Sequence, residues 1–178
     1  MIDEIDGSIL AILQYNARTS QAELSKAVGL APSAVLERLR KLESKGIIRD
    51  YVALIDPHVV DRGLLAFVAV RTSEHGPDMP SAIELGRIPE VLEVHHVAGD
   101  DCYLLKVRTR DAEHLGQLLR QQIASTPSVI STRTTIVLET VKEDPRIAIP
   151  REKMLRDDKP KGLSPPPNDA ATRETVEP

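Results

Sequence analysis

The stretch SQAELSKAVGLAPSAVLERLRKLESKG, residues 20–46, decides the fold of the first part of this chain. Ser20 and Glu23 have the spacing of a capping box, which starts a helix. Gly29 supplies the residue type that ends a helix most easily, and Pro32 suits the first turn of the next one, which runs to Gly46. Two helices joined by so short a turn predict a helix-turn-helix motif.

The second helix of this motif has an apolar face and a basic face. Val35, Leu39 and Leu42 recur at helical spacing, so we expect them to point inward. Residues 24–49 hold six bases against two acids, a local charge of +4, although the whole chain has a formal net charge of −4. The positive charge is therefore concentrated on the part of the chain that would contact the DNA backbone.

A recognition helix presents its first turns to base edges in the major groove. Arg38 can bond guanine through two hydrogen bonds, Glu37 can accept one from cytosine, and the Ala34 methyl group can meet thymine. Ser33 and Lys41 are further candidates for base edges, whereas Arg40, Lys45, Arg49 and Ser20 are expected to contact phosphates. The predicted DNA-binding residues are Ser20, Ser33, Ala34, Glu37, Arg38, Arg40, Lys41, Lys45 and Arg49. The alternative is a solvated helix in which Glu37 and Lys41 merely stabilise each other.

Further elements are expected on both sides of this motif. Ile5, Ile9 and Ile12 recur at i, i+4 and i+7, which predicts an amphipathic helix over about 3–15. The sequence IIRDYVALID at 47–56 is of an extended type and is a candidate wing. The segment PHVVDRG at 57–63 is predicted to be a linker.

The pattern changes from helical to strand-rich after residue 63. Strands are predicted at 64–72, 91–98, 102–109 and 128–142, and helices at 77–88 and 111–125. The order βαββαβ predicts a ferredoxin-like sandwich with its helices on one face of an antiparallel sheet. The chain is thus expected to be α+β, with a winged helix-turn-helix domain at 1–60 and the sandwich at 61–150. Residues 151–178, rich in proline and charge, are predicted to be disordered.

Composition limits the cellular setting of the protein. Cys102 is the single cysteine, so no internal disulfide can form, which fits a reduced cytoplasmic compartment. The opening sequence MIDEID lacks the apolar core of a signal peptide. The longest apolar run, LLAFVAV at 64–70, is too short to span a membrane. We therefore expect a cytoplasmic protein with no membrane partner.

Three stretches carry a resemblance to a known family. They are IDEIDGSILAILQYNARTSQAELSKAVGLAPSAVLERLRKLESKGIIRDYVALIDP, EVHHVAGDDCYLLKVRT and STRTTIVLETVKEDPRIAI, which follow one another over about residues 2–150. In these stretches the chain resembles the Lrp/AsnC family, named after the leucine-responsive regulatory protein and the asparagine regulator. The resemblance implies a transcription regulator that binds double-stranded DNA. It also implies a second domain that forms homodimers and higher homo-oligomers and binds a small effector, commonly an amino acid.

An amino acid ligand needs N–H donors for its carboxylate and an acceptor for its ammonium group. The turn at Gly99, Asp100 and Asp101 can offer both, because a glycine-containing turn exposes N–H groups beside the carboxylates. The resemblance adds Leu105, Thr109 and Asp111 as pocket walls, with Thr135, Ile136 and Val137 from a neighbouring subunit. In the alternative reading, Asp111 is an ordinary helix cap and Asp100 and Asp101 are ordinary turn residues.

Two positions depart from the family pattern. Ala31 stands where the family usually has a Ser cap, and losing a side-chain cap costs roughly 1 kcal/mol. Cys102 stands where the family often has Asp, so a group that is mostly neutral at pH 7 replaces a carboxylate.

Other functions find less support in the sequence. No Ser-His-Asp order, phosphate-binding loop or metal-ligand spacing stands out, so we expect no enzyme, no cofactor and no metal site. His95 and His96 are neighbours in a predicted strand and would point to opposite faces. An RNA-binding sheet would carry more aromatic residues than Phe67 and Tyr103. An effector-independent DNA-binding or assembly protein of the same fold remains an alternative.

Overall fold

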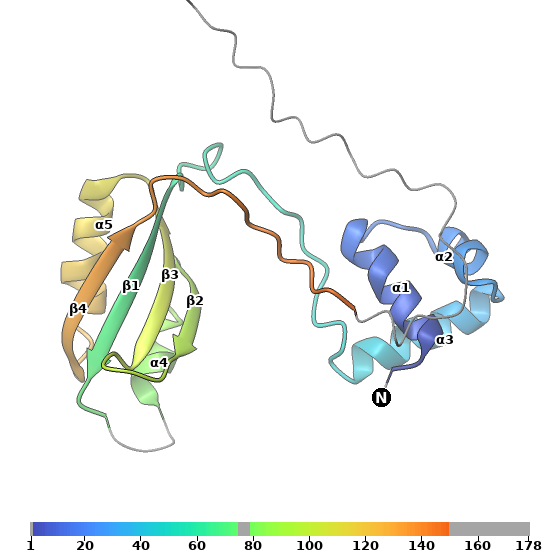
Figure 1. The fold of residues 1–178 in the computed structure, drawn as a ribbon, viewed down its shortest axis with the longest axis horizontal. Coiled ribbons are helices and arrows are strands. Elements are labelled where there is room, and N and C mark those ends of the chain that lie inside the picture. The colour runs from blue at the N-terminus through green and yellow to red at the C-terminus, as the bar shows by residue number, and fades with distance from the viewer. Residues whose placement is uncertain (1, 75–78, 150–178) are drawn as a thin grey trace, which may run out of the picture. The chain divides into compact units, whose positions relative to one another are not determined.

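The computed structural model describes residues 2–74 and 79–149, which divide into two compact units (Figure 1). Among these residues, one unit comprises 2–52 and 145–149, and the other comprises 53–74 and 79–144. The predicted boundaries fall after residues 60 and 150, whereas this division falls after residues 52 and 144. The tail predicted to be disordered, 151–178, lies outside the described residues.

The first unit contains the three helices that the sequence predicts: α1 (Glu4–Tyr15), α2 (Gln21–Val28) and α3 (Pro32–Ser44). Capping boxes start two of them, formed by Asp3 with Asp6 and by Ser20 with Glu23. Gly29 ends α2 in the left-handed conformation at φ 70°, which lets the chain turn at once into α3. Their core is formed by Ile9, Leu24, Val35, Leu39 and Leu42.

The candidate wing at 47–56 forms no strand in the structure. The amides of Ile47 and Ile48 instead donate to the Leu42 carbonyl, at 2.9 and 3.2 Å, and so close the end of α3. Tyr51 holds the following segment against the same helix, because its hydroxyl donates to Glu43 at 2.9 Å. A lone extended segment has no second strand to pair with here, and even a two-stranded hairpin is marginal in water.

The second unit has the predicted βαββαβ order. Its elements are β1 (Leu64–Thr72), α4 (Pro80–Leu85), β2 (Val91–His96), β3 (Tyr103–Thr109), α5 (Ala112–Leu118), a π-helical turn (Leu119–Ile123) and β4 (Val129–Ile136). The sheet is antiparallel with the order β2-β3-β1-β4. β4 is shorter than the predicted strand at 128–142. It ends where Ile136 pairs with Ala66, since only two residues of β1 remain beyond that point.

The two faces of the sheet differ in character. One core holds Val68 and Val70 of β1, Leu105 of β3, Leu85 of α4 and Leu115 of α5, so both helices cover the same face, as predicted. The other face carries residues at the alternate positions, including Phe67, Lys106 and Arg108. None of the helices in residues 2–74 and 79–149 has the length and apolar content of a membrane span.

Candidate DNA-binding surface and effector site

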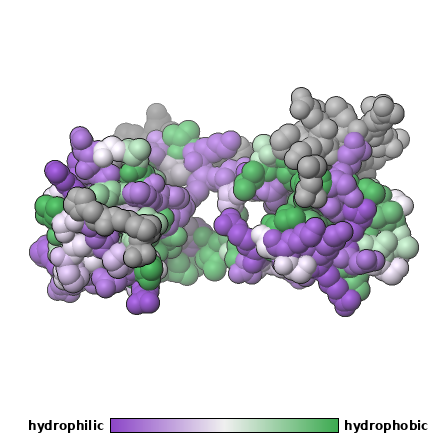
Figure 2. All heavy atoms as spheres, turned by 90° about the horizontal axis from the view of Figure 1, so that it is seen from below, coloured by the Kyte–Doolittle hydropathy of each residue, from purple (hydrophilic) through white to green (hydrophobic). Residues whose placement is uncertain are grey.

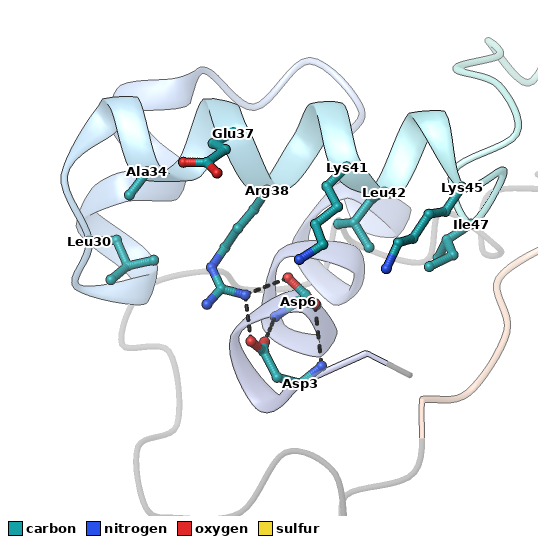
Figure 3. A pocket seen from close by; sticks show the side chains of 10 residues that line it. All are labelled: Asp3, Asp6, Leu30, Ala34, Glu37, Arg38, Lys41, Leu42, Lys45 and Ile47. Carbon is teal, nitrogen blue, oxygen red and sulfur yellow. Dashed lines mark hydrogen bonds and ion pairs between the residues drawn. The ribbon is translucent and has the colours of Figure 1, made fainter.

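The centre of α3 is tied to the start of α1 by charge. Nη1 of Arg38 lies 2.6 Å from an Asp3 carboxylate oxygen and 2.7 Å from an Asp6 carboxylate oxygen (Figure 3). The same two carboxylates form the capping box of α1. Hydrogen bonds to the Asp6 amide and to Arg38 hold the pKa of the Asp3 carboxyl below its ordinary value, and the two carboxylates raise the pKa of Arg38. We call this network the Arg38 clamp.

The Arg38 clamp bears on the role that the sequence predicts for Arg38. The sequence predicted that its guanidinium would bond guanine, which requires donors that point freely into the groove. In the structure the Arg38 side chain is 29 % exposed, and Nη1 is engaged by two carboxylates of the same unit. Base contact would therefore have to use Nη2 or Nε, because Nη1 is taken up by two charge-assisted hydrogen bonds.

Other bases of α3 are available to an external partner. Arg40, Lys41 and Lys45 are exposed, and within the described residues none of them forms an ion pair. Lys41 and Lys45 line a hollow of about 390 Å³ beside the Arg38 clamp, together with Ala34 and Glu37 (Figure 3). The predicted phosphate-binding residues of α3 thus remain open on its surface.

The remaining DNA-binding candidates lie around the two helix starts and beyond the end of α3. Ser20 caps α2, with its hydroxyl 2.7 Å from a Glu23 carboxylate oxygen, and Arg49 is exposed after α3. Ala31 gives α3 no side-chain cap, as its departure from the family pattern predicted. Ser33 is exposed in the first turn, where uncapped N–H groups can meet a phosphate.

The turn between β2 and β3 reaches across the sheet toward β4 (Figure 1). Gly99 has φ 140° and open space where a side chain would begin, so this conformation favours glycine. The Asp101 carboxylate lies 2.6 Å from Nη2 of Arg133 on β4. Arg133 is a residue that the sequence-based prediction missed, because nothing local connects it with a turn that lies 32 residues away.

Cys102 follows this turn and faces the end of β1. Its sulfur accepts a hydrogen bond from the Thr72 amide at 3.5 Å and lies 3.8 Å from the Thr72 carbonyl. These contacts with Thr72 lower the pKa of the Cys102 thiol. The position that often carries Asp in the family therefore holds a partly buried thiol engaged with the backbone.

The other effector candidates lie away from this turn. Leu105 is fully buried in the core, and buried Thr109 donates to the Asp111 carbonyl at 3.2 Å. Asp111 caps α5 by accepting from the His114 amide at 2.8 Å. Since Leu64 pairs with Thr109 and Val70 pairs with Tyr103, Thr109 and the turn lie at opposite ends of β3.

Thr135, Ile136 and Val137 lie at the Thr109 end of the sheet. Thr135 pairs with Phe67, Ile136 pairs with Ala66, and the Val137 amide donates to the Leu65 carbonyl. One subunit thus splits the predicted effector residues into two groups. The resemblance implied that a neighbouring subunit supplies the second group.

Comparison with known proteins decides the family. The Lrp/AsnC ligand-binding domain matches residues 65–147, and a winged helix-turn-helix DNA-binding domain matches residues 2–49. The leucine-responsive regulatory protein of Klebsiella pneumoniae is 42% identical over 152 residues, 83% of this chain and 92% of that protein. The chain belongs to the Lrp/AsnC family. The Escherichia coli K12 leucine-responsive regulatory protein is 41% identical over 150 residues, with the same shares of each chain.

Solved structures of Lrp/AsnC regulators have the same fold. The leucine response regulatory protein LrpA of Mycobacterium tuberculosis matches with a TM-score of 0.76 and 38% identity, over 84% of this chain and all of that one. A Neisseria meningitidis regulator in complex with L-methionine matches with a TM-score of 0.75 and 32% identity, over 87% of this chain and all of that one. The present chain is accordingly a transcription regulator with a DNA-binding helix-turn-helix and an effector-binding domain.

The Arg38 clamp predicts how stability depends on pH. Because the pKa of Asp3 is lowered in the folded protein, its stabilising effect is present above the unfolded value of about 4 and is lost as pH falls further. Arg38→Gln removes one cause of that lowering. Thermal unfolding from pH 6 to pH 3 is expected to show a smaller loss of melting temperature for Arg38→Gln than for the unmodified protein.

Arg40→Gln is the matched control, since Arg40 lies on the same helix without an ion pair in the described structure. It should follow the pH profile of the unmodified protein. Equal losses on acidification for all three proteins would mean that the Arg38 clamp does not stabilise the fold.

Proposed function

We propose that this regulator lays the exposed face of α3 in the major groove of duplex DNA and that an amino acid bound by its second unit adjusts this binding. The observation that supports the proposed DNA binding is the difference between Arg38 and the other basic side chains of α3. Arg38 is paired with two carboxylates, whereas Arg40, Lys41 and Lys45 are exposed and form no ion pair in the described residues. We further propose that the protein acts in the cytoplasm without a membrane partner and has no catalytic role.

The DNA-binding residues then divide into three roles. Ser33, Ala34 and Glu37 lie in the first turns of α3 and are assigned to base edges, with Lys41 beside them. Arg40, Lys45, Arg49 and the start of α2 at Ser20 are assigned to phosphates. Arg38 is assigned to the Arg38 clamp and acts as a positioning residue, since it fixes α3 against α1.

The effector is proposed to be an amino acid. The leucine-responsive proteins among its relatives and the L-methionine complex among similar structures support this class. The structure adds a charge pattern that matches a zwitterion: the Asp101 carboxylate suits an ammonium group, and the Arg133 guanidinium, 2.6 Å away and 77 % exposed, suits a carboxylate. An entering amino acid would replace the Asp101–Arg133 ion pair with two pairs of its own.

A homodimer or larger homo-oligomer is proposed from exposed apolar surface. Leu54, Leu138 and Val141 are 76, 98 and 91 % exposed in the single chain, all in segments outside helices and strands. Green hydrophobic side chains are visible at several places on the molecular surface (Figure 2). Leucine and valine side chains gain about 1.5–3 kcal/mol each when fully buried, so a second copy of the chain would stabilise these segments.

DNA binding is expected to weaken in Lys41→Ala and in Lys45→Ala. Each change removes one positive charge from the exposed face, so the slope of log affinity against log salt should fall by about one unit. Fluorescence anisotropy with a duplex from the protein's own upstream region measures both quantities. Arg120→Ala, an exposed change in the second unit, is the control. Unaltered affinity and slope in both lysine variants would remove α3 as the DNA-binding face.

The role of Arg38 can be separated in the same assay. If Arg38 is a positioning residue, Arg38→Gln and the double change Asp3→Asn with Asp6→Asn should both lower the melting temperature and relax sequence preference. If Arg38 bonds a base instead, only Arg38→Gln should relax the preference, because the double change leaves its guanidinium in place.

The effector is expected to raise the melting temperature, because it binds the folded state. L-leucine and L-methionine at millimolar concentration should do so, whereas 3-methylbutylamine and 4-methylpentanoate should not, since each lacks one charged group. Asp101→Asn and Arg133→Gln should lose the shift, and Arg87→Gln, an exposed arginine elsewhere, should keep it. A regulator that no amino acid stabilises would be effector-independent.

Oligomer formation is tested by sedimentation of the full chain at micromolar concentration. A dimer or larger species is expected, and Leu138→Glu with Val141→Glu should dissociate it by placing charges in the interface. Ile83→Glu, at a residue that is 57 % exposed on α4, should not. A monomer in the unmodified protein would refute the proposed assembly.

A further inference from the structure

The segment after β4 is fastened to α1. The side-chain amide of Gln14 donates to the Ile147 carbonyl at 3.0 Å, and the Ile147 amide donates to Oε1 of Gln14 at 2.7 Å. Beside this pair, the Arg146 guanidinium lies 4.6 Å from the centre of the Tyr15 ring. The single side chain of Gln14 thus satisfies both backbone groups of a residue 133 positions away, an arrangement that fixes this part of the chain on the first unit.

The same segment is fastened to β3 a few residues earlier. Glu143 forms ion pairs with Lys106 and with Arg108, the latter at 2.9 Å. The Lys106 and Arg108 side chains are only 16 and 14 % exposed, so these charges are partly shielded from water. Lys106 is the main cause that lowers the pKa of Glu143, so this carboxylate stays charged throughout the neutral pH range.

Only three residues separate the two attachments, and one of them is Pro145, whose φ angle is restricted. Glu143 belongs to the second unit and Ile147 to the first. β3 begins directly after the turn that contains Asp101, and α1 carries the carboxylates that hold Arg38 on α3. We call residues 143–147 the strap.

We propose that the strap couples the effector unit to α3, and that Gln14 and Glu143 are positioning residues for this coupling. A shift of β3 on effector binding is passed through Glu143 to Ile147, then through Gln14 to α1, and from α1 through the Arg38 clamp to α3. The effector part of this proposal rests on the proposed function. The coupling itself acts in both directions, because a change in one binding equilibrium must be matched by a change in the other.

Three variants of the full chain test the strap. Gln14→Ala removes its attachment to α1, and Glu143→Gln removes the charge that holds it to β3. Gln121→Ala is the matched control, an exposed glutamine in the second unit. Hydrogen exchange of the Ile147 amide checks the contact directly, since it should be protected in the unmodified protein and should exchange faster in Gln14→Ala.

The coupling is measured as the ratio of DNA affinities with and without millimolar L-leucine or L-methionine. In the unmodified protein and in Gln121→Ala this ratio should differ from one by about fivefold or more, the usual range for allosteric coupling. In Gln14→Ala and Glu143→Gln it should fall to within about twofold of one, while the affinity without amino acid stays nearly unchanged. An undiminished ratio in both variants would overturn the proposal.

A second measurement separates this proposal from the proposed effector function. Adding the DNA duplex alone should change hydrogen exchange of the β3 amides in the unmodified protein, and this change should be absent in Gln14→Ala. If no amino acid alters DNA affinity but the duplex still changes β3 exchange, the effector assignment fails and the strap stands. If the duplex leaves β3 exchange unaltered in the unmodified protein, the strap does not couple the units.

Discussion

A single guanidinium group sets the arrangement of the DNA-binding unit. Arg38 on α3 is held by Asp3 and Asp6, so the first turn of α1 and the middle of α3 are fixed to each other. Without this contact the two carboxylates would lie unpaired beside the face that must approach phosphate, and they would repel it. Arg38 offsets one of their two negative charges, and the exposed Lys41 and Lys45 add two positive charges beside them. The same contact therefore fixes α1 against α3 beside the surface proposed to bind DNA.

The second unit contributes a four-stranded antiparallel sheet, on and beside which the effector candidates lie. Its helix-covered face is filled by aliphatic residues, and its turn at Gly99 to Asp101 meets β4 through Arg133. Thr109, Thr135 and Ile136 lie toward the other end of the sheet, whereas Leu105 is buried near its middle. The proposed effector site therefore draws on a neighbouring subunit. Such a site would link ligand binding with assembly, since a pocket built from two chains is present only when the chains associate. We propose that the strap passes the effect of ligand binding from the second unit to the first.

The sequence predicted those features that depend on local pattern. The capping box of Ser20 and Glu23, the turn at Gly29, the helical spacing of Val35 and Leu39 and the βαββαβ order were all evident from neighbouring residues, and the structure confirms them. The contacts of Arg38, Gln14 and Asp101 join residues 32 to 133 positions apart, and no local periodicity reports such pairs. The predicted length of β4 was too great for a similar reason. Where this strand ends depends on where its partner, β1, begins.

The central claim is that identical chains assemble and that each copy of α3 in the assembly recognises a DNA sequence. It is tested most directly by selecting bound duplexes from a randomised pool with the full-length protein and sequencing them over successive rounds. The account predicts enrichment of one motif with two-fold symmetry, its half-sites spaced by about 10 base pairs or a multiple, since each copy of α3 would occupy one major groove. Recovery of duplexes with no common motif would contradict it.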